Sequence, residues 1–432
     1  MKQAVPGLAP RFAAWRILHD VRHGVPFDVA LRRAIVDLEP DDRRLAHELA
    51  AGVFRHRSRL DESLGAAIDR GVDSVRPDTL DALRLGAFQL TQLDRIPAHA
   101  AVQTTVGVAR RLGGRRIAGF VNAVLRKLTR DPAAPAPAGD DLARTHSHPA
   151  WLVDRWLARF GPDETNRLLA WNNARPALVL QPARWARAGL EAALTNAGVE
   201  FHPAPYDAGL VVATRKPTQL PGFHEGGFLV QDPAQRLVTR FFAPAPGSLV
   251  YDACAAPGGK SVALAAVAGT VVAADKTRVR VRRLAETTRR AGPGRIFPIQ
   301  ADALHPPLRR ADAVVLDVPC LGTGTFARNP DARWRVTADA LLRLAEQAAG
   351  FLAAAAPLVA PGGLLLFATC SLEPEENEAQ VERFLTEHPE FRREPAATVP
   401  TELLTDAGDL SLLPQRTGTD GAYAARLRRI AS

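Results

Sequence analysis

Two cysteines stand where a parallel sheet would place reactive groups. Cys320 lies just beyond the apolar run 313–316, and Cys370 directly follows the apolar run 363–369. Such runs predict buried strands, and ligands of open α/β sheets bind beyond the carboxyl ends of the strands. A lone cysteine is usually a small buried hydrophobe. Because two of the chain's three cysteines follow neighbouring strands, we instead predict a pair of thiols that take part in chemistry.

The chemistry that requires such thiols is methylation of a pyrimidine carbon. Ring carbon 5 is not nucleophilic enough to attack a sulfonium methyl group unaided, but a thiolate that adds to carbon 6 makes carbon 5 enamine-like. After methyl transfer, a base removes the proton from carbon 5 and the thiol is eliminated. An acid near ring nitrogen 3 would stabilise the adduct, and Asp317, which opens the motif Asp-Val-Pro-Cys, is suitably placed.

A glycine-rich turn predicts a nucleotide-like ligand. Residues 249–261, LVYDACAAPGGKS, read as a strand, a tight turn and the start of a helix. Gly258 and Gly259 would let the backbone approach a ligand closely, and the free amides of the helix start favour an anionic group. Both a nucleoside triphosphate and S-adenosylmethionine would suit such a turn.

The spacing argues against a nucleoside triphosphate. Gly259, Lys260 and Ser261 resemble the end of a phosphate-binding loop, but that loop needs a glycine five positions before Gly259, where the chain has Cys254. A Gly-x-Gly-x-x-Gly dinucleotide fingerprint is also absent after this strand.

Three acids favour S-adenosyl-L-methionine. Asp275, Asp302 and Asp317 each follow a strand-like run. In a doubly wound sheet they would line one crevice at the carboxyl edge. Asp275 would hold a ribose diol, and Asp302 would meet an adenine amino group.

Composition limits the class of protein. With 432 residues, of which 47% are hydrophobic and 23% charged, the chain is globular and long enough for two or three domains. Its 55 Lys and Arg against 46 Asp and Glu give a net charge of +9, which favours a polyanionic partner. Three cysteines cannot all pair, and no metal-ligand cluster is evident, so we expect a reducing compartment and no metal. Without a signal peptide or an uninterrupted membrane span, we predict a soluble cytoplasmic protein with no membrane partner.

The chain divides into three parts. Residues 11–130 have a helical pattern without a convincing strand. Residues 131–139 form a Pro/Ala linker and the clearest boundary, and strand-like pieces near 177–181 and 210–213 predict a small mixed domain. Asp232 then caps the helix that leads into an alternating α/β domain.

Basic side chains are dense in the helical part. They form either solvated helix faces or a surface that tracks RNA phosphates. The residues concerned are Arg55, Arg57, Arg59, Arg110, Arg111, Arg115, Arg116, Arg126 and Lys127.

Several sequence segments resemble segments of known protein families. The helical part resembles a NusB-type RNA-binding domain in the phrases RLGAFQL (84–90), DRIPAHAAV (94–102) and FVNAVLR (120–126), within which His99 is predicted to be structural. The cysteine motifs resemble those of the Sun family of RNA 5-methylcytosine methyltransferases in the phrases DVPCLGTGT (317–325), RNPDARW (328–334) and TCSLEPEENE (369–378). Together, the two similarities point to the bacterial small-subunit rRNA type of that family, called Sun or RsmB.

The resemblance implies a fold and a partner. The fold would comprise an all-α NusB-like domain at 1–135, a small mixed α/β middle domain at 140–222 and an α/β Rossmann-like class I methyltransferase domain at 223–432. The partner would be 16S rRNA, naked or in an assembling small subunit, with no obligate protein partner.

The resemblance also implies roles for particular residues. Cys370 would be the nucleophile, Cys320 would assist product release, and Asp317 would serve both catalysis and cofactor binding. The cofactor site would comprise Cys254, Ala255, Ala256, Pro257, Gly258, Gly259, Lys260, Asp275, Asp302 and Asp317. Val318 and Leu321 stand where alanine and serine are commoner, which affects the fit around the base rather than the mechanism.

A second class of function is a non-catalytic RNA-binding or antitermination factor with a degenerate methyltransferase domain. Such a domain would be expected to lose one of the two cysteines or the cofactor acids. All are present in this sequence.

Overall fold

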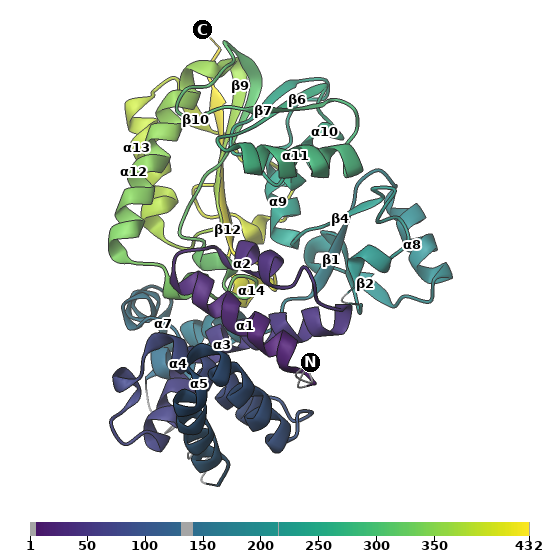
Figure 1. Cartoon of the computed structure of the whole chain (residues 1–432). Helices are drawn as coiled ribbons and strands as arrows, with labels where there is room; N and C mark the ends of the chain where they lie inside the picture. Colours follow the sequence, from purple (N-terminus) through teal and green to yellow (C-terminus); the bar gives the residue numbers. More distant parts are fainter. Residues whose placement is uncertain (1–5, 131–140, 215, 432) are drawn as a thin grey trace. The chain divides into compact units, whose positions relative to one another are not determined.

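The computed structural model describes residues 6–130, 141–214 and 216–431 of a chain that forms two compact units (Figure 1). The N-terminal unit comprises residues 1–174 together with 329–335, and the C-terminal unit comprises 175–328 and 336–432. The predicted Pro/Ala linker lies outside the described residues.

The N-terminal unit is helical and has no strand among its described residues, as predicted. Pro77 opens one of its helices because a proline at the first helical position loses only an amide that would be unbonded anyway. The helices are α1 (Leu8–Arg22), α2 (Phe27–Ala34), α3 (Pro40–Ala67), α4 (Pro77–Gln92), α5 (Ala98–Arg130), α6 (Leu142–Thr145) and α7 (Ala150–Asn173). Apolar faces of α1, α3, α4 and α5 form one core.

The small sheet of the C-terminal unit is antiparallel in the order β2-β3-β1-β4. It is accompanied by helix α8 (Arg187–Asn196). Its strands are β1 (Leu178–Pro182), β2 (Phe201–Pro203), β3 (Leu210–Val212) and β4 (Phe228–Val230). The strands predicted near 177–181 and 210–213 are confirmed, whereas β4 lies beyond the predicted boundary at residue 222 and still pairs with β1. The domain boundaries therefore stay predictions.

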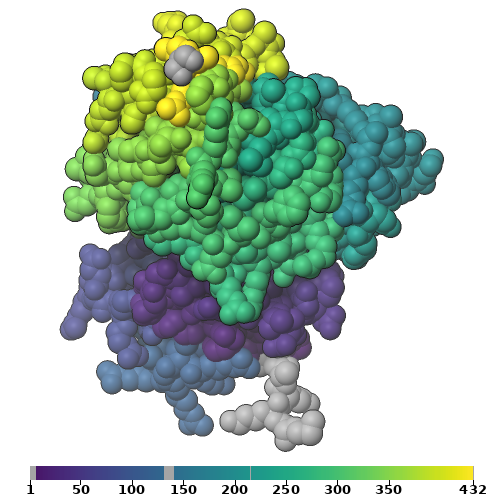
Figure 2. Space-filling view, turned by 90° about the horizontal axis from the view of Figure 1, so that it is seen from above, coloured from purple at the N-terminus to yellow at the C-terminus, as the bar shows by residue number. Residues whose placement is uncertain are grey.

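The large sheet has the strand order β10-β12-β9-β8-β5-β6-β7, with β11 paired to β12. Strands β5 to β9 are parallel, and β12 is antiparallel to its neighbours. The strands are β5 (Leu249–Asp252), β6 (Thr270–Asp275), β7 (Ile296–Gln300), β8 (Ala311–Asp317), β9 (Val359–Thr369), β10 (Phe391–Arg393), β11 (Leu410–Leu412) and β12 (Ala422–Arg429). Figure 2 shows the yellow C-terminal residues among the yellow-green residues that precede them, as this pairing requires.

Helices cover both faces of the large sheet. Alternate strand residues point to opposite faces, so Val250 and Val315 join one core and Tyr251 and Val314 join the other. On the first face lie α9 (Pro233–Phe242), α10 (Gly259–Ala265) and α11 (Arg278–Ala291), and on the second lie α12 (Ala338–Ala355) and α13 (Glu378–Glu387). The short helix α14 spans Pro414–Thr417.

The topology fixes where a ligand site belongs. From β5 the chain proceeds outward through β6 and β7, and it then returns to the other side of β5 for β8 and β9. The strand order thus reverses between β5 and β8, and ligands of such sheets bind beyond the carboxyl ends at this point. No helix in the described residues is long and apolar enough to cross a membrane.

Candidate active site

The two predicted cysteines lie in contact. Parallel pairing of β8 and β9 aligns Asp317 with Ala368 and brings the loops beyond both strands together. The Sγ atoms of Cys320 and Cys370 are 3.3 Å apart, and the amide of Cys370 donates a hydrogen bond to Sγ of Cys320 at 3.3 Å. Both thiols are free and half-buried, so a single substrate atom could meet either one.

Hydrogen bonds from backbone amides to side-chain oxygens hold the two cysteine loops against each other. The amide of Leu321 donates to both carboxylate oxygens of Glu376, at 2.9 and 3.2 Å. The amide of Leu372 donates to Oγ1 of Thr323 at 2.8 Å. Since these bonds are buried, each loop holds the position of the other.

Gly324 lets a third segment approach the cysteines. Its amide donates to the carbonyl of Cys370 at 3.0 Å, and its carbonyl accepts from the amide of Gly421 at 2.7 Å. A Cβ atom at Gly324 would lie 2.6 Å from Cα of Gly421, so only glycine fits there. The segment before β12 is thereby fixed beside the cysteine loops.

The pKa values of the groups around the thiols are shifted. The hydrogen bond with Cys370 and burial both raise the pKa of Cys320 well above its usual range. Burial raises the pKa of Glu376 to about 7. Cys320 therefore stays protonated at neutral pH, which suits a group that exchanges a proton better than one that attacks as a thiolate.

Lys260 holds Asp317. Its buried ammonium group forms an ion pair with Oδ2 of Asp317 at 2.6 Å and also donates to Oε1 of Gln235. Asp317 lies at the end of β8 and Lys260 in the first turn of α10, on the two sides of the switch point. Because the ammonium group is bound to protein side chains, it is not arranged to cradle a triphosphate.

The other two predicted acids lie at the carboxyl ends of neighbouring strands, since Asp275 is the last residue of β6 and Asp302 follows β7. Oδ2 of Asp275 accepts from the amide of Ala256 at 3.3 Å and from Nε of Arg280 at 2.9 Å. Asp302 pairs with Lys276 at 2.9 Å, and this hydrogen bond is the main reason that its pKa is lowered. The ammonium group of Lys276 therefore favours the ionised form of Asp302.

The glycine turn has the predicted form. Gly258 has φ of 105°, which disfavours any other residue, and it precedes helix α10. Cys254, the third cysteine, lies at the start of the turn, and burial together with the charges of Asp252 and Asp317 raises its pKa to about 12. Its thiol is therefore protonated at neutral pH.

Sequence reasoning missed three supporting groups. Glu376 braces the Cys320 loop, Gln235 contacts Lys260, and Oγ of Ser261 donates to Oδ2 of Asp252 at 2.6 Å. Glu376 belongs to the motif TCSLEPEENE (369–378), but a segment with several acids does not reveal which acid is buried. Asp232 caps α9 as predicted, accepting from the amide of Ala234 at 2.9 Å. By contrast, His99, predicted to be structural, is exposed and belongs to no core cluster of the described residues.

The fold and the site define a methyltransferase of the doubly wound α/β class. Three family models match successive parts of the chain: the NusB family at residues 9–130, the ferredoxin-like domain of RsmF/B-like methyltransferases at 148–219, and the 16S rRNA methyltransferase RsmB/F at 239–428. The predicted three-part fold is confirmed, and the middle part is ferredoxin-like.

Relatives match nearly the whole chain. The ribosomal RNA small subunit methyltransferase B of Pseudomonas putida is 35% identical, covering 98% of this chain and 99% of its own length. The protein of the same name from Vibrio cholerae is 34% identical, and the match covers 93% of this chain and 92% of that protein. The chain belongs to the RsmB family of ribosomal RNA small subunit methyltransferases. Membership in a family of enzymes also argues against the alternative of a non-catalytic factor.

Solved structures have a similar fold. A crystal structure of PH0851 superposes with a TM-score of 0.84 and 26% identity, covering 99% of this chain and all of that one. A structure of NSun6 from Pyrococcus horikoshii with SFG has a TM-score of 0.58 and 19% identity, covering 66% of this chain and 99% of that one, and this likeness concerns the fold alone.

Proposed function

We propose that this protein forms 5-methylcytosine in 16S rRNA, with S-adenosylmethionine as the methyl donor and a covalent cysteine adduct at ring carbon 6. The observation that carries the proposal is the pair of thiols 3.3 Å apart in the loops beyond β8 and β9, on one side of the switch point of the sheet. A methyltransferase acting on oxygen or nitrogen has no need of two adjacent thiols, whereas a pyrimidine carbon must first be activated.

The residues at the switch point suit S-adenosylmethionine, which supplies a sulfonium methyl group when bound. No described residue donates a hydrogen bond to Oδ1 of Asp275, so that oxygen is available to a ribose hydroxyl. Asp302 follows β7 and would meet the adenine, while the turn 254–260 would enclose the remainder. The ion pair of Lys260 argues against ATP, so calorimetry should detect S-adenosylhomocysteine binding but no binding of ATP with magnesium.

Cys370 and Cys320 would have different roles in the reaction. Cys370 adds as a thiolate to carbon 6 of cytosine, and a bond from Sγ to that carbon forms while carbon 5 gains nucleophilic character. Asp317 stabilises the adduct at ring nitrogen 3. After methyl transfer, a base takes the proton from carbon 5, the carbon 5–carbon 6 double bond re-forms and the bond from carbon 6 to Sγ of Cys370 breaks. Cys320, which its raised pKa keeps protonated and whose Sγ is 3.3 Å from that of Cys370, would donate a hydrogen bond to the departing thiolate.

Variants of the two cysteines test the proposal. Wild-type protein with 16S rRNA transcript and labelled S-adenosylmethionine should yield 5-methylcytosine, located by bisulfite sequencing. Cys370→Ala should give neither product nor covalent complex while it still binds cofactor and RNA. Cys320→Ala should accumulate the adduct, visible on a denaturing gel as a slow, protease-sensitive band.

Two outcomes would contradict this scheme. If the slow band forms with Cys370→Ala and not with Cys320→Ala, Cys320 is the nucleophile. If both variants methylate 16S rRNA at the wild-type rate, neither thiol takes part and the methyl group is transferred elsewhere than to carbon 5.

A further inference from the structure

A small cavity of the C-terminal unit lies where the small sheet meets helices α9 and α10. It measures about 330 Å³, a size at the lower end of the range for ligand-binding cavities, and so suits a small group. Val262, Ala263 and Ala266 of α10 contribute an apolar part of its wall. Of the predicted cofactor residues, the lining includes Gly259 alone. The cavity is therefore largely separate from the site described above.

Two hydrogen-bond donors that line the cavity are unpaired. Arg236 of α9 is half-buried, and no described residue forms an ion pair with its guanidinium group or accepts a hydrogen bond from it. The side-chain amide of Gln231, which precedes α9, also lacks a hydrogen-bond partner in the described part of the chain. Withdrawing a cation from water costs free energy, which a paired anion normally offsets. Around Arg236 the protein supplies no such anion from its described residues.

A second arginine increases this cost. Arg240 lies four positions after Arg236 on α9, where side chains of a helix are neighbours and like charges repel. Its guanidinium group donates to the carbonyl groups of Tyr206 and Asp207, at 2.9 and 2.7 Å, which holds it beside the cavity. Burial and the charge of Arg240 both lower the pKa of Arg236, so both act against its charged form. An anion bound next to Arg236 would offset both effects.

The acid in the lining is engaged elsewhere. The carboxylate of Asp207 pairs with Arg187 at 2.5 Å, and its side chain is 67% exposed. Arg187 also pairs with Glu191 at 2.7 Å. The charged residues of the lining are thus three arginines and one aspartate, and the excess of positive charge lies with Arg236 and Arg240.

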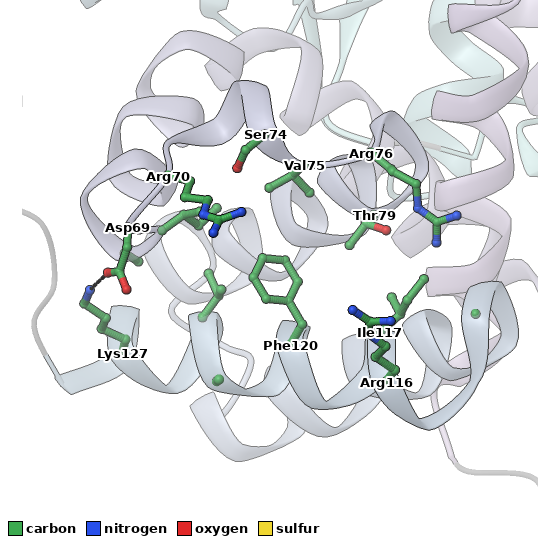
Figure 3. Close-up of a pocket in the computed structure, with 15 residues that line it drawn as sticks. Asp69, Arg70, Ser74, Val75, Arg76, Thr79, Arg116, Ile117, Phe120 and Lys127 are labelled. Carbon is green, nitrogen blue, oxygen red and sulfur yellow. Dashed lines mark hydrogen bonds and ion pairs between the residues drawn. The ribbon is translucent and has the colours of Figure 1, made fainter.

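A larger cavity in the N-terminal unit provides a contrast (Figure 3). It measures about 980 Å³ and is partly lined by the second half of α5, which follows a kink at Gly114. Arg70, Arg76 and Arg116 line that cavity, but all three are exposed, so water solvates their charges. Burial creates no need for an anion there. The half-buried Arg236 is in a different situation.

We infer that the cavity between the small sheet and helices α9 and α10 binds a phosphate group. The guanidinium group of Arg236 offers a planar pair of donors that matches two phosphate oxygens, and the side-chain amide of Gln231 donates to a third. Two sources supply such a group, the backbone of an RNA strand and free inorganic phosphate. The inference goes beyond the proposed function because this site uses neither the two thiols nor the cofactor.

Thermal unfolding of the full chain tests free phosphate, with sodium phosphate compared with sodium chloride of equal ionic strength. Phosphate stabilises most proteins because it is excluded from their surface, so the site is revealed by the difference between variants. Phosphate should raise Tm more in the wild type than in Arg236→Gln or Gln231→Ala. Calorimetry should show about tenfold or more weaker phosphate binding by Arg236→Gln. Arg343→Gln, which removes an exposed arginine of α12 outside the lining, should match the wild type.

The same variant distinguishes a ligand site from a structural arginine. In buffer without phosphate, Arg236→Gln should have a Tm equal to or above that of the wild type, because it removes a half-buried, unpaired charge beside Arg240. A clearly lower Tm would mean that Arg236 supports the fold, and it would overturn the inference.

Anisotropy of a short fluorescein-labelled single-stranded RNA, measured with the full chain over a range of salt, tests the RNA source. Arg236→Gln should reduce the slope of log affinity against log salt by about 0.7, the value for one phosphate of a single strand. Arg236→Lys retains the charge and should retain the slope, and Arg343→Gln again serves as the control.

The two measurements together identify the source. A reduced slope without specific stabilisation by inorganic phosphate assigns the site to the RNA backbone, and the reverse result assigns it to free phosphate. If Arg236→Gln matches the wild type in both, the cavity binds no phosphate. Neither measurement depends on Cys320, Cys370 or methyl transfer, so failure of this inference is distinguishable from failure of the proposed function.

Discussion

At the scale of single residues, the environment of each thiol sets its chemistry. Cys254, Cys320 and Cys370 are all half-buried and free. Burial together with the neighbouring carboxylates raises the pKa of Cys254, and the hydrogen bond with Cys370 together with burial raises the pKa of Cys320. The different roles proposed for the three side chains rest on these differences in burial, charge and hydrogen bonding.

Asp252 gives a pH-dependent prediction. It is fully buried at the end of β5, and burial raises its pKa to about 7. Because the folded pKa lies above the unfolded value, the folded state holds a proton that the unfolded state releases. The free energy of unfolding of the wild type should therefore fall as pH rises from about 4 to about 7.

Asp252→Asn should remove this loss. The free energy of unfolding of the variant, relative to that of the wild type, should rise by up to about 4 kcal/mol between about pH 4 and about pH 8. Urea unfolding at each pH would measure this difference. The amide can still accept the hydrogen bond from Ser261, so the comparison isolates the charge. A stability difference that does not vary with pH would mean that Asp252 has an ordinary pKa.

At the scale of elements, the two halves of α5 depend on one glycine. Gly114 adopts φ of 71° and ψ of −156°, a backbone conformation that is essentially limited to glycine. Gly114→Ala should lower the free energy of unfolding by about 1–3 kcal/mol, and differential scanning calorimetry would measure the change. A Cβ there has nothing within 4 Å, so the cost comes from the backbone alone.

Gly119→Ala is the matched control for that prediction. Gly119 lies in the helical second half of α5, and a Cβ there also meets nothing within 4 Å. Replacement with alanine should stabilise the protein by about 0.5–1 kcal/mol because alanine favours a helix. If the two variants shift stability in the same direction, the kink does not impose the expected strain.

At the scale of the whole molecule, buried ion pairs join distant parts of the chain. Within the C-terminal unit, Arg328 pairs with Asp232 at 2.5 Å and with Asp420 at 2.7 Å. It thereby connects the cap of α9, the loop beyond β8 and the segment before β12. Burial raises the pKa of Asp420 to about 7, so this acid depends on its cationic partner to ionise.

Arg328→Gln should therefore lower the free energy of unfolding by about 3–5 kcal/mol, the usual loss of stability when one partner of a buried ion pair is removed. Loss of the cation would raise the pKa of Asp420 further, so the deficit should widen as pH rises above about 7. Urea unfolding at about pH 6 and about pH 8 would measure it. Arg383→Gln, which removes an exposed arginine with two surface partners, should change little. Equal small effects of both variants would refute a structural role for Arg328.

The segment 329–335 affects how the N-terminal unit can be studied. The indole of Trp334 donates to the carbonyl of Phe54 at 2.8 Å, and the guanidinium of Arg57 lies 4.9 Å from the centre of its ring. Deletion of residues 1–135 would remove these partners and expose the indole. Point substitutions of arginines are therefore a cleaner test of RNA binding than truncation.

Local sequence determined much of the architecture. Apolar periodicity marked the helices of the N-terminal unit and the strands β5 to β9, and capping chemistry placed Asp232 at the start of α9. These features depend on neighbours within a few residues, so a single sequence suffices to predict them. The motifs also indicated which strand ends carry the cysteines and acids.

Only the tertiary structure decided how these parts meet. Cys320 and Cys370 are fifty positions apart, and their contact follows from the pairing of β8 with β9. The closeness of Gly324 to Gly421 and the assignment of residues 329–335 to the N-terminal unit likewise arise from packing between distant segments. Periodicity reports which face of an element is buried, but it does not report what that face is buried against, because many partners would exclude water equally well.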